Sequence, residues 1–148
     1  MRLHNRNSGV LGLFLLMVAV GCGKGKDPTY PLKGRVFFSD GNPVPAGSIS
    51  FRAIDRNPPI SARGEIQPDG TFTVSTFDRN DGAVAGRHQV AIVSAGGLAP
   101  RLGFVPPPVY PPVDSRFADF EHSGLEVTVS SDPSANNFEL QVLPPKVE

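Results

Sequence analysis

Short runs of alternating apolar and polar residues, each closed by glycine, proline, asparagine or aspartate, dominate this sequence. In the first such run, residues 34–38, Val36 and Phe38 fall on one face of an extended chain, and a turn cluster follows at residues 39–43. Alternation with a period of two is typical of a strand with one buried face. Beyond residue 31, no stretch keeps apolar residues at helical spacing over three turns. The chain is therefore predicted to be all-β.

Six further runs repeat this pattern, at residues 48–52, 61–67, 71–75, 87–94, 125–129 and 138–142. Their clearest predicted inward residues are Ile49, Phe51, Phe72, Val74, Val90 and Ile92. A hairpin is expected at Pro68-Asp69-Gly70, because proline presets one turn angle and glycine accepts a positive φ. Seven short strands with one apolar face each cannot be stable singly. We therefore expect an antiparallel, immunoglobulin-like β-sandwich.

The segment 95–123 interrupts the alternation, and six prolines fall between Pro100 and Pro112. Proline lacks an amide donor and is excluded from helix interiors and central strands, so a long Pro-rich loop is predicted. Loops of this length are usually functional or disordered. The aromatic residues of this loop could stack on sugars or anchor a protein partner. Alternatively, they cover an open edge of the sandwich. These candidate binding residues are Phe104, Tyr110 and Phe117.

The N-terminal segment predicts export. Arg2, His4 and Arg6 precede an uncharged run at residues 8–21, and its apolar core is shorter than the roughly 20 residues that a membrane-spanning helix needs. Small residues then lead into Cys22, the single cysteine of the chain. A basic stretch, an apolar core and a small-residue cleavage site together are typical of a cleaved signal peptide.

These residues resemble the bacterial lipoprotein signal, in which a small residue precedes a cysteine that is lipidated on sulfur before cleavage. Ala19 stands where leucine is usual. The resemblance implies a signal peptide at residues 1–21 and a lipid anchor on Cys22, which would also remove an unpaired thiol from an oxidising compartment. The alternatives are an ordinary signal peptide with an incidental cysteine, or an uncleaved anchor. Gly23, in place of an aspartate after the cysteine, favours the outer membrane.

Processing would leave residues 22–148, which is the size of one domain. Residues 22–31 offer little to bury and are predicted to be a lipidated tether, and residues 32–143 are predicted to be the folded domain. This processed chain carries twelve basic and fourteen acidic residues, with no basic cluster beyond Lys24 and Lys26. Binding to nucleic acid is therefore not expected.

Four motifs follow one another along the predicted domain: Gly34-x-Val36, Pro43-Val44-Pro45, Asp69-Gly70-Thr71-Phe72 and Gly86-Arg87-His88-Gln89-Val90. Their order resembles the carboxypeptidase regulatory-like, or transthyretin-like, β-sandwich family over residues 32–142, although His88 stands where tyrosine is usual. Together with the signal, Val109-Tyr110 and Ser123-Gly124-Leu125, they resemble small planctomycete-type lipoproteins. The resemblance implies a transthyretin-like sandwich and confers no peptidase activity.

The sequence contains no motif that predicts catalysis or a resident metal or cofactor. After removal of the signal, His88 and His122 are the only imidazoles, and neither a zinc-site spacing nor a nucleophile elbow is present. His88 is predicted to be a half-exposed strand residue. The stretch 78–82 resembles the start of a calcium loop, but its glycine does not fit the EF-hand pattern, so a structural turn is predicted.

We therefore expect a lipid-anchored cell-envelope protein that acts as a non-enzymatic binding or structural module. Its expected partners are the membrane and either an envelope protein or a polysaccharide. Two alternatives remain, a carbohydrate-binding module and an accessory subunit of an envelope enzyme or secretion complex.

Overall fold

The computed structural model describes residues 25–95 and 111–146. Within these residues the chain forms nine β-strands and two short 3-10 turns, and it contains no α-helix. The strands are β1 (Thr29–Tyr30), β2 (Lys33–Phe38), β3 (Gly47–Ala53), β4 (Ser61–Ile66), β5 (Thr71–Thr73), β6 (Ala83–Val84), β7 (Gly86–Ser94), β8 (Glu126–Val129) and β9 (Asn137–Val142), and the turns are η2 (Ser115–Ala118) and η3 (Pro133–Ala135). The all-β class predicted from the alternation is confirmed.

All seven predicted runs are strands of one sheet, whose order is β8-β7-β3-β4-β5-β2-β9. The predicted hairpin is also present, since β4 and β5 pair antiparallel and Gly70 between them has φ 81°. The Asp69 carboxylate accepts the amide N–H of Thr71 at 3.0 Å and closes this turn. The inward residues predicted from the alternation are buried, namely Val36, Phe38, Ile49, Phe51, Phe72, Val74, Val90 and Ile92.

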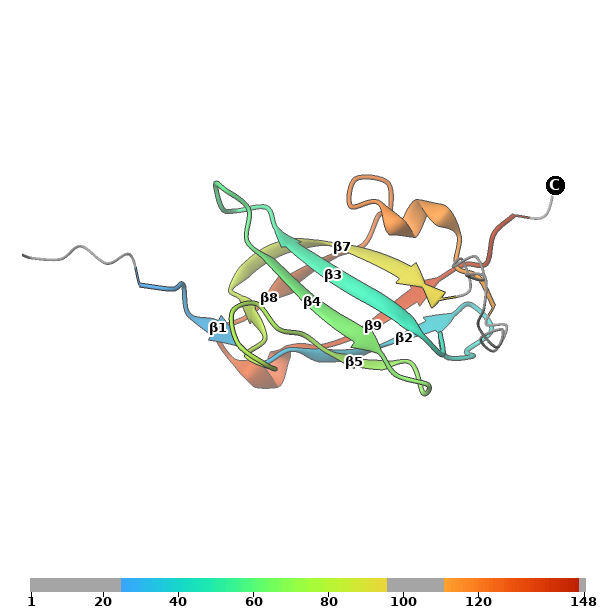
Figure 1. Ribbon diagram of the computed structural model, residues 1–148, viewed down its shortest axis with the longest axis horizontal. Coiled ribbons are helices and arrows are strands. Elements are labelled where there is room, and N and C mark those ends of the chain that lie inside the picture. Colours follow the sequence, from blue (N-terminus) through green and yellow to red (C-terminus); the bar gives the residue numbers. More distant parts are fainter. Residues whose placement is uncertain (1–24, 96–110, 147–148) are drawn as a thin grey trace, which may run out of the picture.

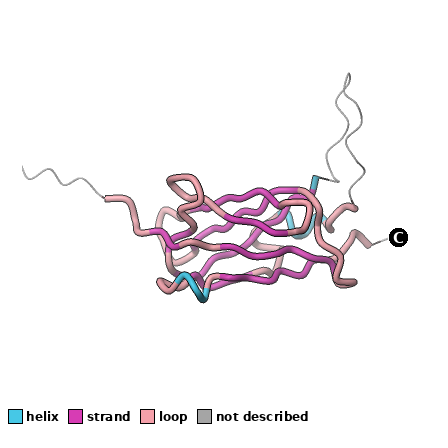
Figure 2. Tube along the Cα trace, turned by 90° about the horizontal axis from the view of Figure 1, so that it is seen from below, coloured by secondary structure: helices cyan, strands magenta, loops and turns pink. Residues whose placement is uncertain are grey.

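The large sheet bends around a single core. β4 and β5 share one register pair, Ile66 with Phe72, whereas β3 shares six pairs with β4 and seven with β7. The narrow β4–β5 ladder is where the sheet turns, so β3, β4 and β7 lie over β2 and β9 (Figure 1). The strands run along the long axis of the molecule (Figure 2). The architecture is a nearly closed, sandwich-like or barrel-like sheet.

The expectation of a purely antiparallel sandwich is wrong, because β9 pairs parallel with β2 over six register positions. The reason lies in the strand order. Five antiparallel pairs separate β8 from β2, so these two strands run in opposite directions. The short connection after β8 reverses the chain once more, and β9 therefore runs with β2.

Asn136 holds this connection in place. Its side chain is buried, and its amide nitrogen donates to the carbonyl of Ser130 at 2.9 Å and to that of Pro31 at 3.3 Å. Its side-chain oxygen accepts the amide N–H of Ser130 at 2.8 Å. The amide of Lys33 donates to the Asn136 backbone carbonyl at 3.1 Å. One buried amide side chain thus ties the β8–β9 connection to the entry of β2.

The fold begins earlier than the predicted boundary at residue 32. Thr29 pairs with Val84 and Tyr30 with Ala83, so β1 and β6 form a second, two-stranded sheet inside the predicted tether. Lys26 adds an ion pair of 3.2 Å with Asp78. Two-residue strands carry too little alternation to be recognised in a sequence.

Candidate functional site

Three adjoining hollows lie along the outward face of β4, β5, β2 and β9, and together they are called the outer groove. Their volumes are about 430, 490 and 510 Å³. Thr73 lines all three hollows, Lys33 and Asn137 line two of them, and Gln67 also lines two. Because they share these walls, the hollows adjoin one another around the place where the sheet turns between β4 and β5.

The alternation of the strands directs polar side chains into the outer groove. In β2, Val36 faces the core, so Lys33 and Arg35 face outward. In β4, Arg63 and Glu65 occupy the outward positions. Strands β5 and β9 contribute the exposed residues Thr71, Thr73, Asn137 and Glu139.

Four cationic side chains line the outer groove: Lys33, Arg35, Arg63 and Arg79. Within the described residues, no carboxylate oxygen lies within 4.0 Å of their side-chain nitrogens. The pKa of Asp69 is lowered, first by hydrogen bonds from the Thr71 hydroxyl and amide and further by the charge of Arg35. Arg35 therefore lies near enough to Asp69 for the two charges to interact, although no ion pair within 4.0 Å joins them.

The loop at residues 76–82 forms one rim of the outer groove and is held by Asp81. The Asp81 carboxylate accepts the amide N–H groups of Thr76, Phe77 and Asp78 at 2.7, 3.0 and 3.0 Å. Burial raises the pKa of Asp81, but these hydrogen bonds lower it by more, so the net shift is downward. The carboxylate is occupied by its own loop, as expected of the structural turn predicted from the sequence.

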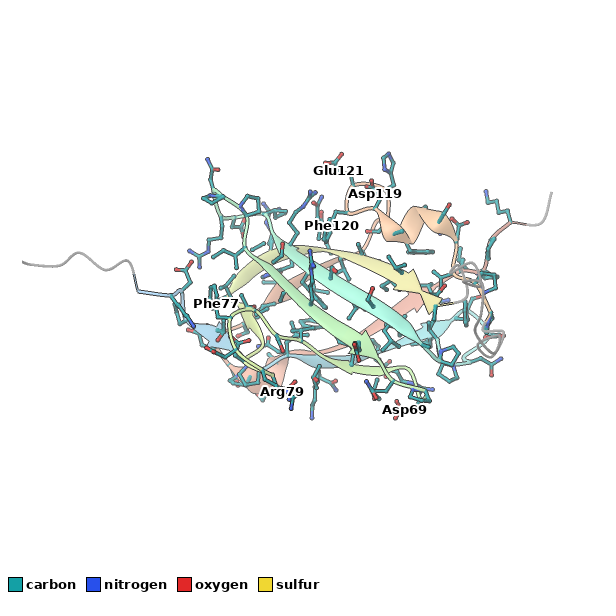
Figure 3. All side chains as sticks on the ribbon, viewed as in Figure 1. Asp69, Phe77, Arg79, Asp119, Phe120 and Glu121 are labelled. Carbon is teal, nitrogen blue, oxygen red and sulfur yellow. The ribbon has the colours of Figure 1, made fainter. Side chains whose placement is uncertain are left out.

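Asn80 connects this rim to the floor of the outer groove. It has φ 57°, a conformation that asparagine tolerates better than most residues. Its amide N–H donates to the Ser75 hydroxyl at 2.8 Å, and its side-chain oxygen accepts the Thr73 hydroxyl at 3.3 Å. Figure 3 shows Arg79 of the same loop on the side of the molecule where Asp69 lies.

A second polar cluster lies on the opposite side of the molecule, where Figure 3 labels Phe120 and Glu121. The Arg52 guanidinium donates to Gln89 Oε1 at 2.6 Å and lies 4.6 Å from the centre of the Phe120 ring. A nitrogen of the same group lies 3.7 Å from Glu121 Oε1. Arg52 thus fastens the loop that follows η2 to the sheet, and its charge is already partnered.

His88 is buried, with 1% of its surface exposed, and the prediction of a half-exposed residue is wrong. Its ring meets Phe51 edge-on, with the ring centres 6.4 Å apart. Nδ1 lies 3.0 Å from the Gly86 carbonyl oxygen, which can only accept, so Nδ1 carries the proton in this hydrogen bond. The alternation does assign His88 to the inward set with Val90 and Ile92, and its polarity obscured this signal.

Burial lowers the pKa of His88 below its ordinary value of 6.5, against the opposing effects of the Gly86 carbonyl and the Asp55 charge. Below pH 6.5 the unfolded chain binds a proton at His88. The folded chain does not bind this proton until the pH reaches the lower pKa of the buried His88 ring. We therefore expect the free energy of unfolding to decrease as the pH is lowered through this window, by up to about 1.4 kcal/mol per pH unit. Urea unfolding between pH 7.5 and pH 5 measures the slope. His88→Phe should flatten it, and an unchanged slope would assign the dependence to another group.

Of the three candidate loop aromatics, Phe117 is described and is buried, with 3% of its surface exposed. It lies in η2 and belongs to the core cluster, so its ring is not free to stack on a ligand. The Val113 amide donates to Ser94 Oγ at 3.0 Å and helps to hold this segment against β7. Phe104 and Tyr110, like the lipidation candidate Cys22, lie outside the described residues.

Sequence analysis missed the outer groove, although each of its strands was predicted. The signal that could have revealed it is the set of outward-facing residues in the alternating runs. Among them, Lys33, Arg35, Arg63 and Glu65 are charged. Those residues lie about 30 positions apart in the chain and meet only because β5 lies between β2 and β4. The sequence does not specify this strand order.

Within residues 25–95 and 111–146, no three histidine, cysteine, aspartate or glutamate side chains lie close enough to hold a metal ion. The described part of the chain also has no helix of the length and hydropathy needed to cross a membrane. Comparison of the chain with protein-family models, curated proteins and solved structures finds no match.

Proposed function

We propose that this chain is a lipid-anchored cell-envelope protein whose folded domain is a non-enzymatic binding module, with the outer groove as its ligand site. The observation that carries the binding role is the gathering of four cations, none with a carboxylate within 4.0 Å among the described residues, around three adjoining hollows. Glu65 and Glu139 also line these hollows, so the four cations outnumber the acids by two. A ligand of opposite charge accounts for their arrangement.

The position of β1 supports a role in presenting this groove near a membrane. β1 is at one end of the long axis, and the chain after β9 leaves at the other (Figure 1). Six residues, 23–28, separate Cys22 from the start of β1, and an extended chain of this length reaches about 20 Å. A lipid on Cys22 would thus hold the β1 end close to the bilayer. As argued from Gly23, we place this bilayer at the outer membrane.

The proposal includes a transthyretin-like identity for the sheet. In support, Gly34 and Val36 lie in β2, Asp69 and Gly70 form the β4–β5 turn, and Gly86 begins β7. These are the positions that the family pattern gives to the same motifs. The parallel β2–β9 pair is the feature that such an assignment must accommodate.

Replacement of Cys22 by serine tests the anchor. We expect the full-length protein, expressed with its signal in a bacterial host, to partition almost entirely into the detergent phase, and Cys22→Ser to move to the aqueous phase. Each buried methylene contributes about 0.8 kcal/mol, and two or more acyl chains are needed for durable anchoring. Phase separation with non-ionic detergent, followed by immunoblotting, measures the distribution. Gly25→Ser is the matched control and should stay in the detergent phase.

Two other outcomes would contradict the lipid anchor. If the unchanged protein is found in the aqueous phase, Cys22 is an incidental residue of an ordinary signal peptide. If the unchanged protein is found in the detergent phase with the unprocessed mass, the N-terminal segment is an uncleaved anchor.

A further inference from the structure

We propose that the outer groove binds an acidic polysaccharide, a chain rich in hydroxyl groups that carries carboxylates at intervals. This inference rests on the proposed binding function and specifies its ligand. Three features of the groove support it: the spacing of its cations, the acids between them and the chemistry of its uncharged walls.

The cations are spread along the groove instead of forming one cluster. Lys33 and Arg35 face outward from β2 two residues apart, which is about 7 Å along the strand. Arg63 lies on β4, with β5 between it and β2, and it bridges Ser75, whereas Arg35 pairs with Thr71, so the two arginines are also offset along the strands. Arg79 extends the series to the rim. Such spacing fits anions that are distributed along a polymer better than a single compact anion.

Three cations elsewhere on the described surface, Lys26, Arg52 and Arg87, have carboxylate partners. Arg87 is 3.3 Å from an Asp55 carboxylate oxygen, and its backbone amide donates to the same carboxylate at 2.8 Å. Lys26 is paired with Asp78 at 3.2 Å. Among the described residues, the groove cations have no such partner within 4.0 Å, as is also true of Arg56, Arg116 and Lys146, so what distinguishes them is that they gather around adjoining hollows.

Two acids interrupt the positive charge of the outer groove. Glu139 of β9 lies opposite Arg35 in the parallel ladder, and Glu65 is two residues from Arg63 on the same face of β4. Fixed carboxylates repel a densely charged polymer such as a polyphosphate or a nucleic acid. They also accept hydrogen bonds from hydroxyl groups. The combination selects a ligand with sparse charge and many hydroxyls.

Hydroxyl and amide side chains make up much of the remaining wall: Ser48, Gln67, Thr71, Thr73, Asn80 and Asn137. Such groups both donate and accept, as sugar hydroxyls do. The one aromatic residue along the described lining is Phe72, which is 2% exposed and offers no stacking face. A neutral sugar that relies on stacking therefore has little to bind, and recognition depends on charge and hydrogen bonds.

Binding of oligogalacturonate, a linear uronic acid oligomer, tests the proposal against a neutral ligand with the same backbone. The full-length protein in non-ionic detergent is titrated with the free acid and with its methyl ester, in which every carboxylate is neutral. We expect the acid to bind at least tenfold more tightly at low salt, because charge-assisted hydrogen bonds are the stronger ones. This preference should decrease as salt screens the groove.

Two substitutions locate the site. Arg35→Gln with Arg63→Gln is expected to weaken binding of the acid about tenfold or more and to leave binding of the ester almost unchanged. Arg116→Gln with Lys146→Gln removes the same two charges at exposed positions outside the groove and should bind as the unchanged protein does. Thermal unfolding of each variant confirms that the fold is retained, and Lys33→Gln is the substitute if the double variant unfolds.

The possible outcomes distinguish an error in the ligand from an error in the binding site or in the lipid anchor. Equal binding of acid and ester, or tighter binding of polyphosphate than of the acid, would overturn the acidic polysaccharide and leave a binding module with another ligand. Undiminished binding in the double variant would overturn the groove as its site. An unchanged protein found in the aqueous phase of the Cys22 experiment would instead overturn the lipid anchor without affecting these affinities.

Discussion

Replacing Phe51 with alanine is expected to lower the free energy of unfolding by about 3–5 kcal/mol, the largest effect of any single change considered for this fold. Phe51 has no exposed surface. From β3 it reaches Phe72 of β5, with ring centres 5.9 Å apart, and it also meets the edge of His88. Its ring therefore joins strands on either side of the narrow β4–β5 ladder, and its loss would leave a cavity where the sheet bends.

Urea unfolding monitored by circular dichroism measures this effect. Domains of this size are stable by roughly 5–15 kcal/mol, so the variant should show a much lower midpoint with a similar slope. Phe77→Ala makes the same chemical change at a ring that is 39% exposed, and it should lower stability by less than about 1 kcal/mol. Equal effects at the two positions would mean that Phe51 is not at the centre of the core.

Replacing Gly34 with alanine is expected to destabilise the fold by about 2–3 kcal/mol, because the added methyl group has no space. It would lie 2.7 Å from Cζ of Phe72 and closer still to the backbone carbonyl oxygen of Phe138. Gly34 pairs with both of these residues, one on each neighbouring strand. The carbonyl belongs to the parallel ladder, so relief of the clash requires β9 to move away from β2.

Amide hydrogen exchange shows whether β9 responds as expected. In Gly34→Ala, amides of Asn137–Val142 should exchange faster than those of β3 and β7. Gly25→Ala is the matched control, since a methyl group there has no neighbour within 4 Å. If Gly34→Ala is as stable as the control, β2 and β9 leave space for a methyl group at this residue, contrary to the packing described.

The strands of the large sheet could be predicted because each carries its own signal. Val36 and Phe38, for example, fall on one face of a run that ends at a turn cluster, and both are buried. The turn at Gly70 was equally predictable, because its positive φ favours a glycine. In both cases the determining interactions lie within a few residues of one another.

What could not be predicted depends on contacts between distant segments. The parallel β2–β9 pair follows from a strand order that no local pattern specifies. β1 and β6 are two residues each and are stabilised by contacts between segments more than 50 positions apart, such as the Thr29 hydroxyl with the Asp81 carboxylate at 3.4 Å. The outer groove has the same origin, since its residues meet only after the sheet has formed.

His88 shows a different limit of sequence patterns. The alternation assigns it to the core, but a titratable side chain is usually exposed, and the second consideration led to the wrong prediction. The Gly86 carbonyl that satisfies Nδ1 comes from two residues earlier in the same strand. This backbone hydrogen bond satisfies the buried ring nitrogen, so at this position the alternation was the better guide.

Nuclear magnetic resonance of arginine side chains tests the central claim most directly, that the outer groove of this protein binds an acidic polysaccharide. Oligogalacturonate is titrated into the ¹⁵N-labelled protein while the Nε–H signals are recorded. The account predicts that the signals of Arg35, Arg63 and Arg79 shift together with one affinity, and that the signal of Arg116, which stacks on Phe117 outside the groove, does not. Shifts confined to Arg116 or to Arg52, or no shift at any arginine, would contradict it.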